Sequence, residues 1–346
     1  MTTDAQSSAG PLAGPAVSRK RRIAELVLDH LVWLMLAAVL AAFSAFVPNF
    51  AQIGIYANII EQSTFVGVMA IGLAIVVIAG HMDLSVESTA ALAAMLTGIL
   101  FCARGIGLGY AFSPEWLVVP VSLAISLAIG GLIGALNGVF TVRFKMNAFI
   151  VTLASFIWVR GLVVAVSGGR SAQDLSPSLR VIGIETVLHV PLIAWIAILV
   201  FAVFSFVMAK TPFGRHIMLI GGNAVAAFRA GIKVDALTVW SFVLAGAIAG
   251  LAGWLLAIRT SGATANLGTG MLFNAFAAVV IGGVSLKGGV GKLPGVYAGV
   301  LLLSSIHTAI NLMGLPAHYT QVILGLLVLA AVLLDTLKHT IRRRLT

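Results

Sequence analysis

Charged residues are scarce in this chain. Of its 346 residues, 9% are Asp, Glu, Lys or Arg, and 60% are hydrophobic. Soluble domains usually carry about 25% charged residues. Apolar runs of about 20 residues, the length that crosses a bilayer as a helix, recur along the sequence. The composition therefore excludes an ordinary soluble domain and predicts an all-α, polytopic membrane protein.

Cysteine and acidic residues are also few. Cys102 is the only cysteine, which excludes an intrachain disulfide and a metal site built from several cysteines. The seven histidines are scattered, and none pair at the spacing with which a helix binds metal, so we predict no metal site. The 21 Lys and Arg outnumber the 11 Asp and Glu, which gives a net charge of +10. In a membrane protein, this excess is typical of basic residues at the cytoplasmic ends of spans rather than of nucleic-acid binding.

Glycine, in contrast, is abundant, with 37 residues. Several lie four residues apart, as in Gly130, Gly134 and Gly138, or in Gly246 and Gly250. Small residues at this spacing allow two membrane helices to approach closely. We expect these glycines to pack helices into a compact bundle and to carry no function of their own.

Ten apolar segments are candidate membrane spans. They lie at residues 31–47, 54–79, 85–103, 117–140, 148–167, 191–209, 236–258, 269–285, 293–313 and 319–336. With the N-terminus inside, the inner connecting segments hold 16 of the 21 Lys and Arg residues. Because basic residues favour the cytoplasmic side, this asymmetry predicts that both termini are cytoplasmic.

The same division defines the expected domains. Residues 1–30 form a disordered, basic cytoplasmic arm, residues 31–337 form the transmembrane domain, and residues 338–346 form a basic cytoplasmic tail. A cleaved signal peptide at the N-terminus is the less favoured alternative, since the later apolar runs must insert in any case. The segment between residues 168 and 190 is the longest on the outer face, where a soluble partner could dock.

A polar, basic segment at residues 211–235 interrupts the apolar runs. Within it, Asn223 is a good helix N-cap and Gly231 a good C-terminal stop, which predicts a short helix over residues 224–230. Val225 and Phe228 are three residues apart and would form one apolar face, with Arg229 at its rim. A helix this short is marginal on its own, so we expect a partner to dock against it. A solvated loop with one helical turn is the alternative.

Residues 80–88, with the sequence GHMDLSVES, place Asp83 and Glu87 between two apolar runs without a neighbouring Lys or Arg. A carboxylate near the centre of a bilayer costs about 2.5 to 3.5 kcal/mol, so these side chains should face protein or water. Asp83 followed by Ser85 also resembles a cap that opens a new helix. We therefore predict a broken helix pair whose irregular backbone lines a cavity. A plain loop at the membrane surface, capped by Asp83, is the alternative.

Other polar side chains lie in or near the apolar runs. We interpret six residues as candidates to line a translocation path: Glu61, Asp83, Ser85, Glu87, Asn137 and Asn274. Amides and hydroxyls suit a polar, hydroxyl-rich ligand, whereas an ion would favour a denser carboxylate cluster. For a single amide, helix-to-helix hydrogen bonding or capping is the alternative role.

The glycine-rich stretch at residues 282–295 superficially resembles a phosphate-binding loop. Lys292 is followed by Leu293 instead of Ser or Thr, and Leu286 stands where the loop requires glycine. We therefore predict a cytoplasmic turn, and no nucleotide site elsewhere in the chain. No arrangement indicates a nucleophile with its base, so an enzyme is disfavoured.

Four segments resemble the permease subunits of bacterial ABC importers for ribose, xylose and related monosaccharides. They are GHMDLSVES at 80–88, GALNGVFTVRFKMNAFIVTLASFIWVRG at 134–161, TPFGRHIMLIGGNAVAAFRAGIKV at 211–234 and FNAFAAVVIGGVSLKGGVG at 273–291. Their order is that of the family, and together they cover most of the chain beyond residue 50. The chain departs from the family pattern at Glu87, at Met146 and Asn147, and at Ala154, which bears on the substrate and on gating near Glu87.

The resemblance implies a transport subunit of the bacterial inner membrane that performs no covalent chemistry and binds no cofactor. ATP and Mg would be bound by one or two partner ATPase subunits, and the other partners would be a second permease, identical or paralogous, and a periplasmic sugar-binding protein. The segment that would couple to the ATPase contains Gly221, Gly222, Asn223, Val225, Phe228, Arg229 and Gly231. A permease for another small polar solute, such as a branched-chain amino acid, and an ion-coupled secondary transporter are the alternatives.

Overall fold

The computed structural model describes residues 30–109 and 114–316, together with residues 319, 322–323, 325–326, 329 and 333. The predicted arm at residues 1–30, apart from its last residue, lies outside the described residues. So do the tail at residues 338–346 and most of the tenth predicted span.

Nine apolar helices of the described residues coincide with the first nine predicted spans. They are α2 (Leu31–Phe46), α3 (Ile53–Ile78), α4 (Val86–Phe101), α5 (Val118–Arg143), α6 (Ala148–Ser167), α8 (Leu192–Lys210), α11 (Val234–Thr260), α12 (Met271–Ile281) and α13 (Leu293–Leu312). Six of them, α3, α5, α6, α8, α11 and α13, are long and apolar enough to cross a membrane, whereas α2, α4 and α12 are shorter. The described part of the chain is therefore mostly helical, with six candidate spans, and the prediction of ten stays a prediction.

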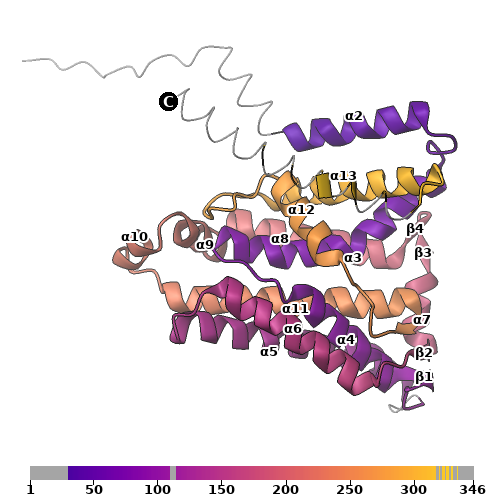
Figure 1. The fold of residues 1–346 in the computed structure, drawn as a ribbon, viewed down its shortest axis with the longest axis horizontal. Coiled ribbons are helices and arrows are strands. Elements are labelled where there is room, and N and C mark those ends of the chain that lie inside the picture. Colours follow the sequence, from indigo (N-terminus) through magenta and orange to yellow (C-terminus); the bar gives the residue numbers. More distant parts are fainter. Residues whose placement is uncertain are drawn as a thin grey trace, which may run out of the picture.

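The remaining elements lie at the two ends of the helix bundle. The helical ones are a 3-10 turn, η1 (Glu115–Leu117), and three short helices, α7 (Pro177–Ile184), α9 (Pro212–Gly222) and α10 (Ala224–Arg229). The strands are β1 (Cys102–Gly105), β2 (Ala172–Leu175), β3 (Thr186–Val187), β4 (Val190–Pro191) and β5 (Gly262–Ala263). Figure 1 shows α9 and α10 at one end, here called the α10 end, and the strands with α7 at the other, here called the strand end.

The strands correct the all-α prediction at one end of the molecule. They form an antiparallel sheet in the order β1-β2-β5 and a separate β3-β4 hairpin. Cys102 pairs with Leu175, and Ala172 pairs with Ala263. The sheet therefore joins three segments between helices that are far apart in the sequence. Strands of two to four residues carry too short an alternation of apolar and polar side chains to be recognised from sequence.

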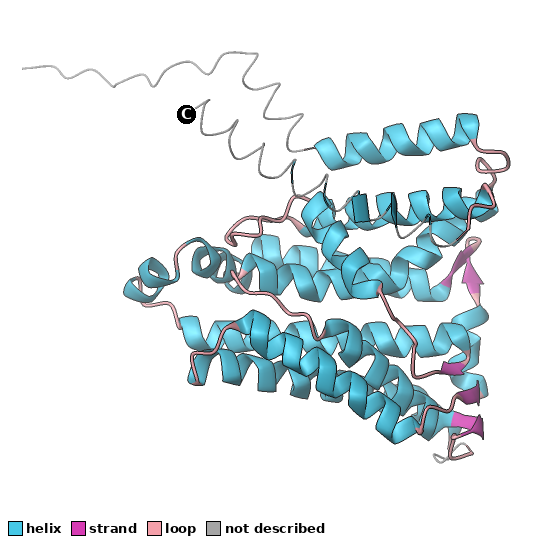
Figure 2. Cartoon of the chain, in the orientation of Figure 1, coloured by secondary structure: helices cyan, strands magenta, loops and turns pink. Residues whose placement is uncertain are grey.

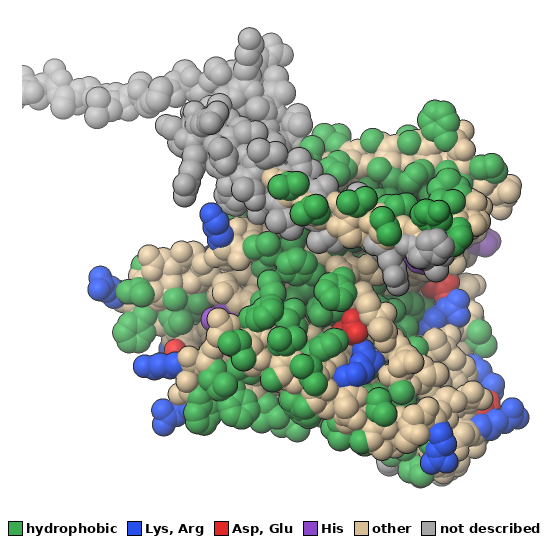
Figure 3. Space-filling view, viewed as in Figure 1, with side chains coloured by type: hydrophobic (Ala, Val, Ile, Leu, Met, Phe, Trp, Pro, Cys, Tyr) green, Lys and Arg blue, Asp and Glu red, His purple; other side chains and the backbone are tan. Residues whose placement is uncertain are grey.

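The core of the bundle is built around α3 and α11, which are mostly buried, whereas α5, α6 and α8 expose most of their surface. Figure 3 shows hydrophobic side chains over the middle of the molecule and Lys and Arg chiefly at its two ends. A helix that is apolar on all sides is stable at a surface only when that surface is covered by lipid or protein. This distribution fits a protein that crosses a membrane along the long axis of its helices.

The glycine spacing brings α5 and α11 into backbone contact, as predicted. A Cβ atom on Gly130 would overlap the carbonyl oxygen of Gly246, and a Cβ atom on Gly246 would overlap that of Gly130. Gly134 meets the carbonyl oxygen of Phe242 in the same way. At Gly131, which lies on a different side of α5, the nearest atom would be 3.9 Å away. Only the glycines of the repeating set are therefore needed for the close approach.

Two non-helical segments enter the bundle from opposite ends. Residues 79–85 follow α3 and lead to the start of α4, and residues 264–270 follow β5 and lead to the start of α12. In Figure 2 both run as loops into the middle of the molecule, where α4 and α12 begin. The first is the helix break predicted near residues 80–88, since α3 ends at Ile78 and α4 begins at Val86. The second was not predicted.

Candidate functional site

A chain of hydrogen bonds ends on the carboxylate of Asp83 in the first helix break. The Oδ1 atom of Asp83 accepts from the backbone N of Ser85 at 2.9 Å and from its Oγ at 2.6 Å. Asn137 on α5 donates from Nδ2 to Ser85 Oγ at 2.9 Å, and Ser155 on α6 donates to Asn137 Oδ1 at 2.5 Å. Trp158 Nε1 donates in turn to Ser155 Oγ at 3.2 Å. Each side chain in this series therefore donates its hydrogen bond to the next one, and the last bond ends on Asp83.

This network is buried inside the bundle. The side chains of Asp83 and Asn137 are fully buried and that of Ser85 nearly so, and Asp83 Oδ2 has no hydrogen-bond partner among the described residues. Thr152 on α6 donates to the carbonyl oxygen of Met82 at 3.2 Å, which attaches the break itself to α6. The polar groups thus bind an irregular stretch of backbone inside the bundle.

The prediction that Asp83 caps α4 is displaced by two residues in the structure. The N-cap of α4 is Ser85, whose side chain makes no capping bond. Asp83 instead accepts the N–H of Ser85 from two positions earlier, which is an Asx turn that closes the extended segment before the helix begins. Asp83 organises the start of α4, but from outside its first turn.

Glu87 lies in the first turn of α4 and has an ion-pair partner that the sequence did not indicate. Its Oε1 atom is 2.8 Å from Nη2 of Arg160 on α6. Its Oε2 atom accepts from the backbone N of Gly270 at 3.0 Å and of Leu272 at 2.9 Å, at the start of α12. The two helix breaks therefore meet at this carboxylate. The 73 residues that separate Glu87 from Arg160 hide this pairing from local sequence patterns.

The other candidate residues lie in different places. Glu61 on α3 pairs with Arg259 near the end of α11, toward the strand end. Asn274 is half-buried on α12 and joins none of the networks described. The six candidates thus divide into the Asp83, Ser85 and Asn137 network, the Glu87 contact, and two residues apart from both.

A second polar cluster between α3 and α13 was not singled out from the sequence. Gln62 donates to Asn58 Oδ1 at 2.6 Å, and its Oε1 lies 3.2 Å from Nδ1 of His307. Asn311 Nδ2 lies 3.3 Å from the same ring nitrogen. The spacing of Asn58 and Gln62, one helical turn apart, was the available signal, but His307 becomes visible only when α13 packs on α3.

The short helix predicted within residues 211–235 is present as α10. Asn223 Oδ1 accepts from the backbone N of Ala226 at 2.9 Å, which confirms the N-cap. Gly231 has φ of 80°, its N–H bonds to the carbonyl of Phe228, and the N–H of Ile232 bonds to that of Ala227. These two bonds form the Schellman motif that ends a helix at a left-handed glycine. The helix ends one residue earlier than predicted, at Arg229.

The apolar face of α10 is open to solvent. Val225 is 61% exposed and Phe228 is 71% exposed, whereas Ala227 is buried.

The preceding helix, α9, was not predicted from the sequence. Its signals were Pro212 at the first helical turn, where proline is favoured, and the three-residue spacing of the buried Ile217 and Ile220.

Three glycine-rich segments meet where α9 ends. The N–H of Gly289 donates to the carbonyl oxygen of Ile78 at 2.8 Å, at the end of α3. A Cβ atom on Gly221 would overlap that same oxygen, and one on Gly288 would lie 2.8 Å from the Cα of Gly80. Figure 1 shows this end of α3 beside α9. The contact, here called the glycine junction, joins the α9 and α10 segment directly to the first helix break.

Beside the glycine junction lies a cavity of about 800 Å³. Its lining includes residues 79–82 of the helix break, residues 220–224 between α9 and α10, and residues 145–149 before α6. The cavity therefore opens at the α10 end and reaches the break that carries Asp83.

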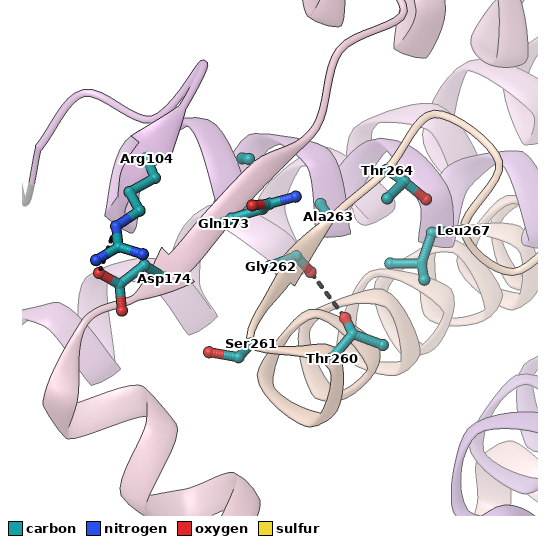
Figure 4. Close-up of a pocket in the computed structure, with 10 residues that line it drawn as sticks. Arg104, Gln173, Asp174, Thr260, Ser261, Gly262, Ala263, Thr264 and Leu267 are labelled. Carbon is teal, nitrogen blue, oxygen red and sulfur yellow. Dashed lines mark hydrogen bonds and ion pairs between the residues drawn. The ribbon is translucent and has the colours of Figure 1, made fainter.

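A smaller pocket of about 470 Å³ opens at the strand end. Figure 4 shows Arg104 from β1 beside Asp174 from β2, with Nε of Arg104 3.6 Å from Oδ2 of Asp174. Residues 260–264 form the other wall, where Thr260 Oγ1 donates to the carbonyl of Gly262 at 2.8 Å. Charged and hydroxyl groups thus line the molecule's surface at this end.

A bundle of apolar helices in which two helix breaks meet inside the protein, with an exposed short helix at one end, is the arrangement typical of membrane transport proteins. The family model described as branched-chain amino acid transport system / permease component matches residues 55–332, and the chain belongs to this family. Together with the ribose and arabinose permeases reported next, this match confirms the resemblance found in the four motifs.

Named relatives match over most of their length. The chain is 31% identical to the ribose import permease protein RbsC of Haemophilus influenzae, over 91% of this chain and 95% of the relative. It is 33% identical to RbsC of Escherichia coli K12, over 89% and 95%. It is 32% identical to the L-arabinose ABC transporter permease protein AraH of Azospirillum brasilense, over 98% and 96%. No solved structure matches the chain.

Proposed function

We propose that this chain is the permease subunit of an ATP-binding-cassette importer that moves a monosaccharide of the ribose or xylose type across the bacterial inner membrane. The observation that carries the proposal is the match to ribose and arabinose permeases. Each match extends over about nine-tenths or more of this chain and of the relative. The amide and hydroxyl groups around the helix breaks suit a solute rich in hydroxyl groups. The chain itself performs no covalent chemistry.

The α10 end is proposed to be cytoplasmic and to receive the ATPase. Val225 and Phe228 present an apolar face to solvent on a helix of only six residues. A partner that covers this face would bury both side chains, which stabilises the contact by about 1.5 to 3 kcal/mol for each. ATP and Mg would be bound by that partner. The other proposed partners are a second permease and a periplasmic sugar-binding protein at the strand end.

The translocation path is proposed to pass the point where the two helix breaks meet. Substrate sites of transporters often lie at mid-depth between broken helices. The Asp83 network and the Glu87 contact hold these breaks, and the cavity at the α10 end reaches the first of them. Alternating access then requires only that the ATPase bind differently to two arrangements of the same bundle.

The proposed topology has ten spans with both termini cytoplasmic, and cysteine labelling can test it without removing the native cysteine. Cys102 is the only cysteine and is fully buried, so the unaltered chain should not react with a maleimide. Arg170→Cys should react with a membrane-impermeant maleimide in intact spheroplasts. Lys233→Cys should react only after the membrane is opened. Labelling of Lys233→Cys from outside would contradict both the topology and the ATPase assignment.

Substitution of Asp83 should impair transport in a graded way. Asp83→Asn retains an oxygen that can accept both bonds from Ser85, whereas Asp83→Ala leaves the backbone N–H and the hydroxyl of Ser85 without their acceptor. An unsatisfied buried donor costs about 1 to 3 kcal/mol, so uptake should fall about tenfold or more in the alanine variant and much less in the asparagine variant. The measurement is uptake per inserted protein. Equal and complete loss in both variants would favour ion coupling by the charge.

The family description leaves a branched-chain amino acid as the competing solute. The two solutes differ chemically, because an amino acid brings a carboxylate and an ammonium group and a sugar brings hydroxyl groups only. The test is ATPase activity of the complete complex in nanodiscs, measured with its binding protein and a panel of solutes. Stimulation by ribose, xylose or arabinose is expected. Stimulation by leucine or valine alone would replace the sugar assignment.

A further inference from the structure

The carboxylate of Glu87 contacts three separate parts of the fold although only 3% of its surface is exposed. Oε1 binds Arg160 of α6 at 2.8 Å, and Oε2 accepts from the N–H groups of Gly270 and Leu272. Gly270 is the N-cap of α12, with φ of 87°, and no side chain caps the helix from that position. Glu87 therefore supplies from α4 the acceptor that α12 lacks in its own sequence.

Arg160 extends the same contact to the second helix break. Its Nη1 atom donates to the carbonyl oxygen of Ala265 at 3.1 Å and to that of Leu267 at 3.3 Å. Residues 264–270 carry the chain from the strand end into the bundle. One ion pair thus connects α4, α6, the segment at residues 264–270 and the start of α12.

Two physical effects make this contact strong. The N–H groups at the start of a helix carry partial positive charge and favour an anion. The contact is also largely shielded from water. In such a buried environment, an unpaired charge is far more costly than a paired one. Removing the carboxylate would leave Nη2 of Arg160, a side chain that is only 20% exposed, and two backbone N–H groups without their acceptor.

We propose that Glu87 is a positioning residue, a built-in anion that fixes the start of α12 and the second helix break against α4 and α6. It sets where the two breaks meet inside the membrane. The inference depends on the proposed function only for its effect on uptake. The anion contact itself concerns the stability of the purified chain and needs neither sugar nor ATPase.

Chemical rescue by formate tests this role. Glu87→Ala in the purified full-length permease should unfold about 5 °C or more below the unaltered chain. Formate is a small carboxylate that fits the space left by the side chain and should raise the unfolding temperature of this variant again, with sodium chloride at equal ionic strength as the control. In the assembled complex, formate should restore uptake in parallel. No rescue of a monodisperse Glu87→Ala protein would overturn the proposal.

Glu61→Ala is the matched control variant. It also removes a carboxylate from an ion pair with an arginine, but that pair lies at no helix start. Its unfolding temperature should not respond to formate beyond the response to chloride. An equal response in both variants would mean that formate acts on the protein in general, and it would overturn the specific role of Glu87.

A double-mutant cycle keeps the proposal testable if Glu87→Ala does not fold. Glu87→Gln and Arg160→Met each remove the ion pair and retain side-chain bulk. Because both act on one contact, the double variant should lose little more thermal stability than the more damaging single variant. Additive losses would show that the two residues act independently, which contradicts the proposal. Sugar uptake by the unaltered chain is measured separately, so failure of the transport assignment would be recognised as such.

Discussion

Replacing Gly221 by Ala should abolish transport, whereas the same change at Gly222 should leave it intact. A Cβ atom on Gly221 would overlap the carbonyl oxygen of Ile78 and lie 2.5 Å from the backbone N of Gly289. These atoms are backbone and cannot move away without opening the glycine junction, at a cost of about 1 to 3 kcal/mol or more. Gly222 has no atom within 4 Å of its added Cβ, so alanine there should be tolerated.

The two alanine variants form a matched pair, since they alter adjacent residues at the end of α9 in the same way. The measurements are membrane insertion, ATPase activity of the complex and sugar uptake. We expect Gly221→Ala to insert but to hydrolyse ATP with little uptake, because the junction connects the docking helix α10 to the first helix break. Normal uptake by Gly221→Ala would show that the glycine junction does not couple α10 to the first helix break.

Phe228→Asp should prevent the ATPase from associating with the permease. The ring is 71% exposed on α10, so the change removes no packing within the chain and should not affect insertion. Loss of a buried aromatic side chain at an interface costs about 1.5 to 3 kcal/mol, and the new carboxylate adds a desolvation cost. We therefore expect at least a 10-fold weaker association, measured by co-purification of the ATPase and by uptake.

Phe228→Leu is the control for this substitution. It keeps an apolar side chain at the same position, so it should retain most of the association. Asn223→Ala provides an independent test, since it removes the bond to Ala226 and about 0.5 to 2 kcal/mol of local helix stability without touching the apolar face. If Phe228→Asp binds the ATPase as tightly as the unaltered chain, α10 is only a solvent-exposed turn.

Local signals in the sequence predicted those features that depend on neighbouring residues. The first nine apolar helices, the cap at Asn223, the left-handed Gly231 and the close approach of Gly130 to Gly246 all follow from patterns within a few turns of helix. The break after α3 was predicted in the same way, from an acidic residue within an apolar run. Each of these features is determined by short-range geometry and by the cost of burying polar groups.

The partners of the buried charges could not be predicted. Glu87 and Arg160 are 73 residues apart, and Glu61 and Arg259 are 198 apart, so only packing of the helices brings them together. The second helix break has no acidic residue to reveal it. Apart from Leu267, residues 264–270 are small or polar, a composition that is equally compatible with an ordinary surface loop. The short strands at the strand end lack enough residues for a periodic pattern.

ATP-dependent sugar uptake tests the central claim most directly. The permease would be reconstituted into proteoliposomes with its ATPase and binding protein, and uptake of radiolabelled ribose, xylose and arabinose would be compared with ATP enclosed or absent. We predict uptake of at least one of these sugars that requires enclosed ATP and is insensitive to collapse of proton and sodium gradients. Uptake by the permease alone, driven by either gradient without ATP, would contradict the account.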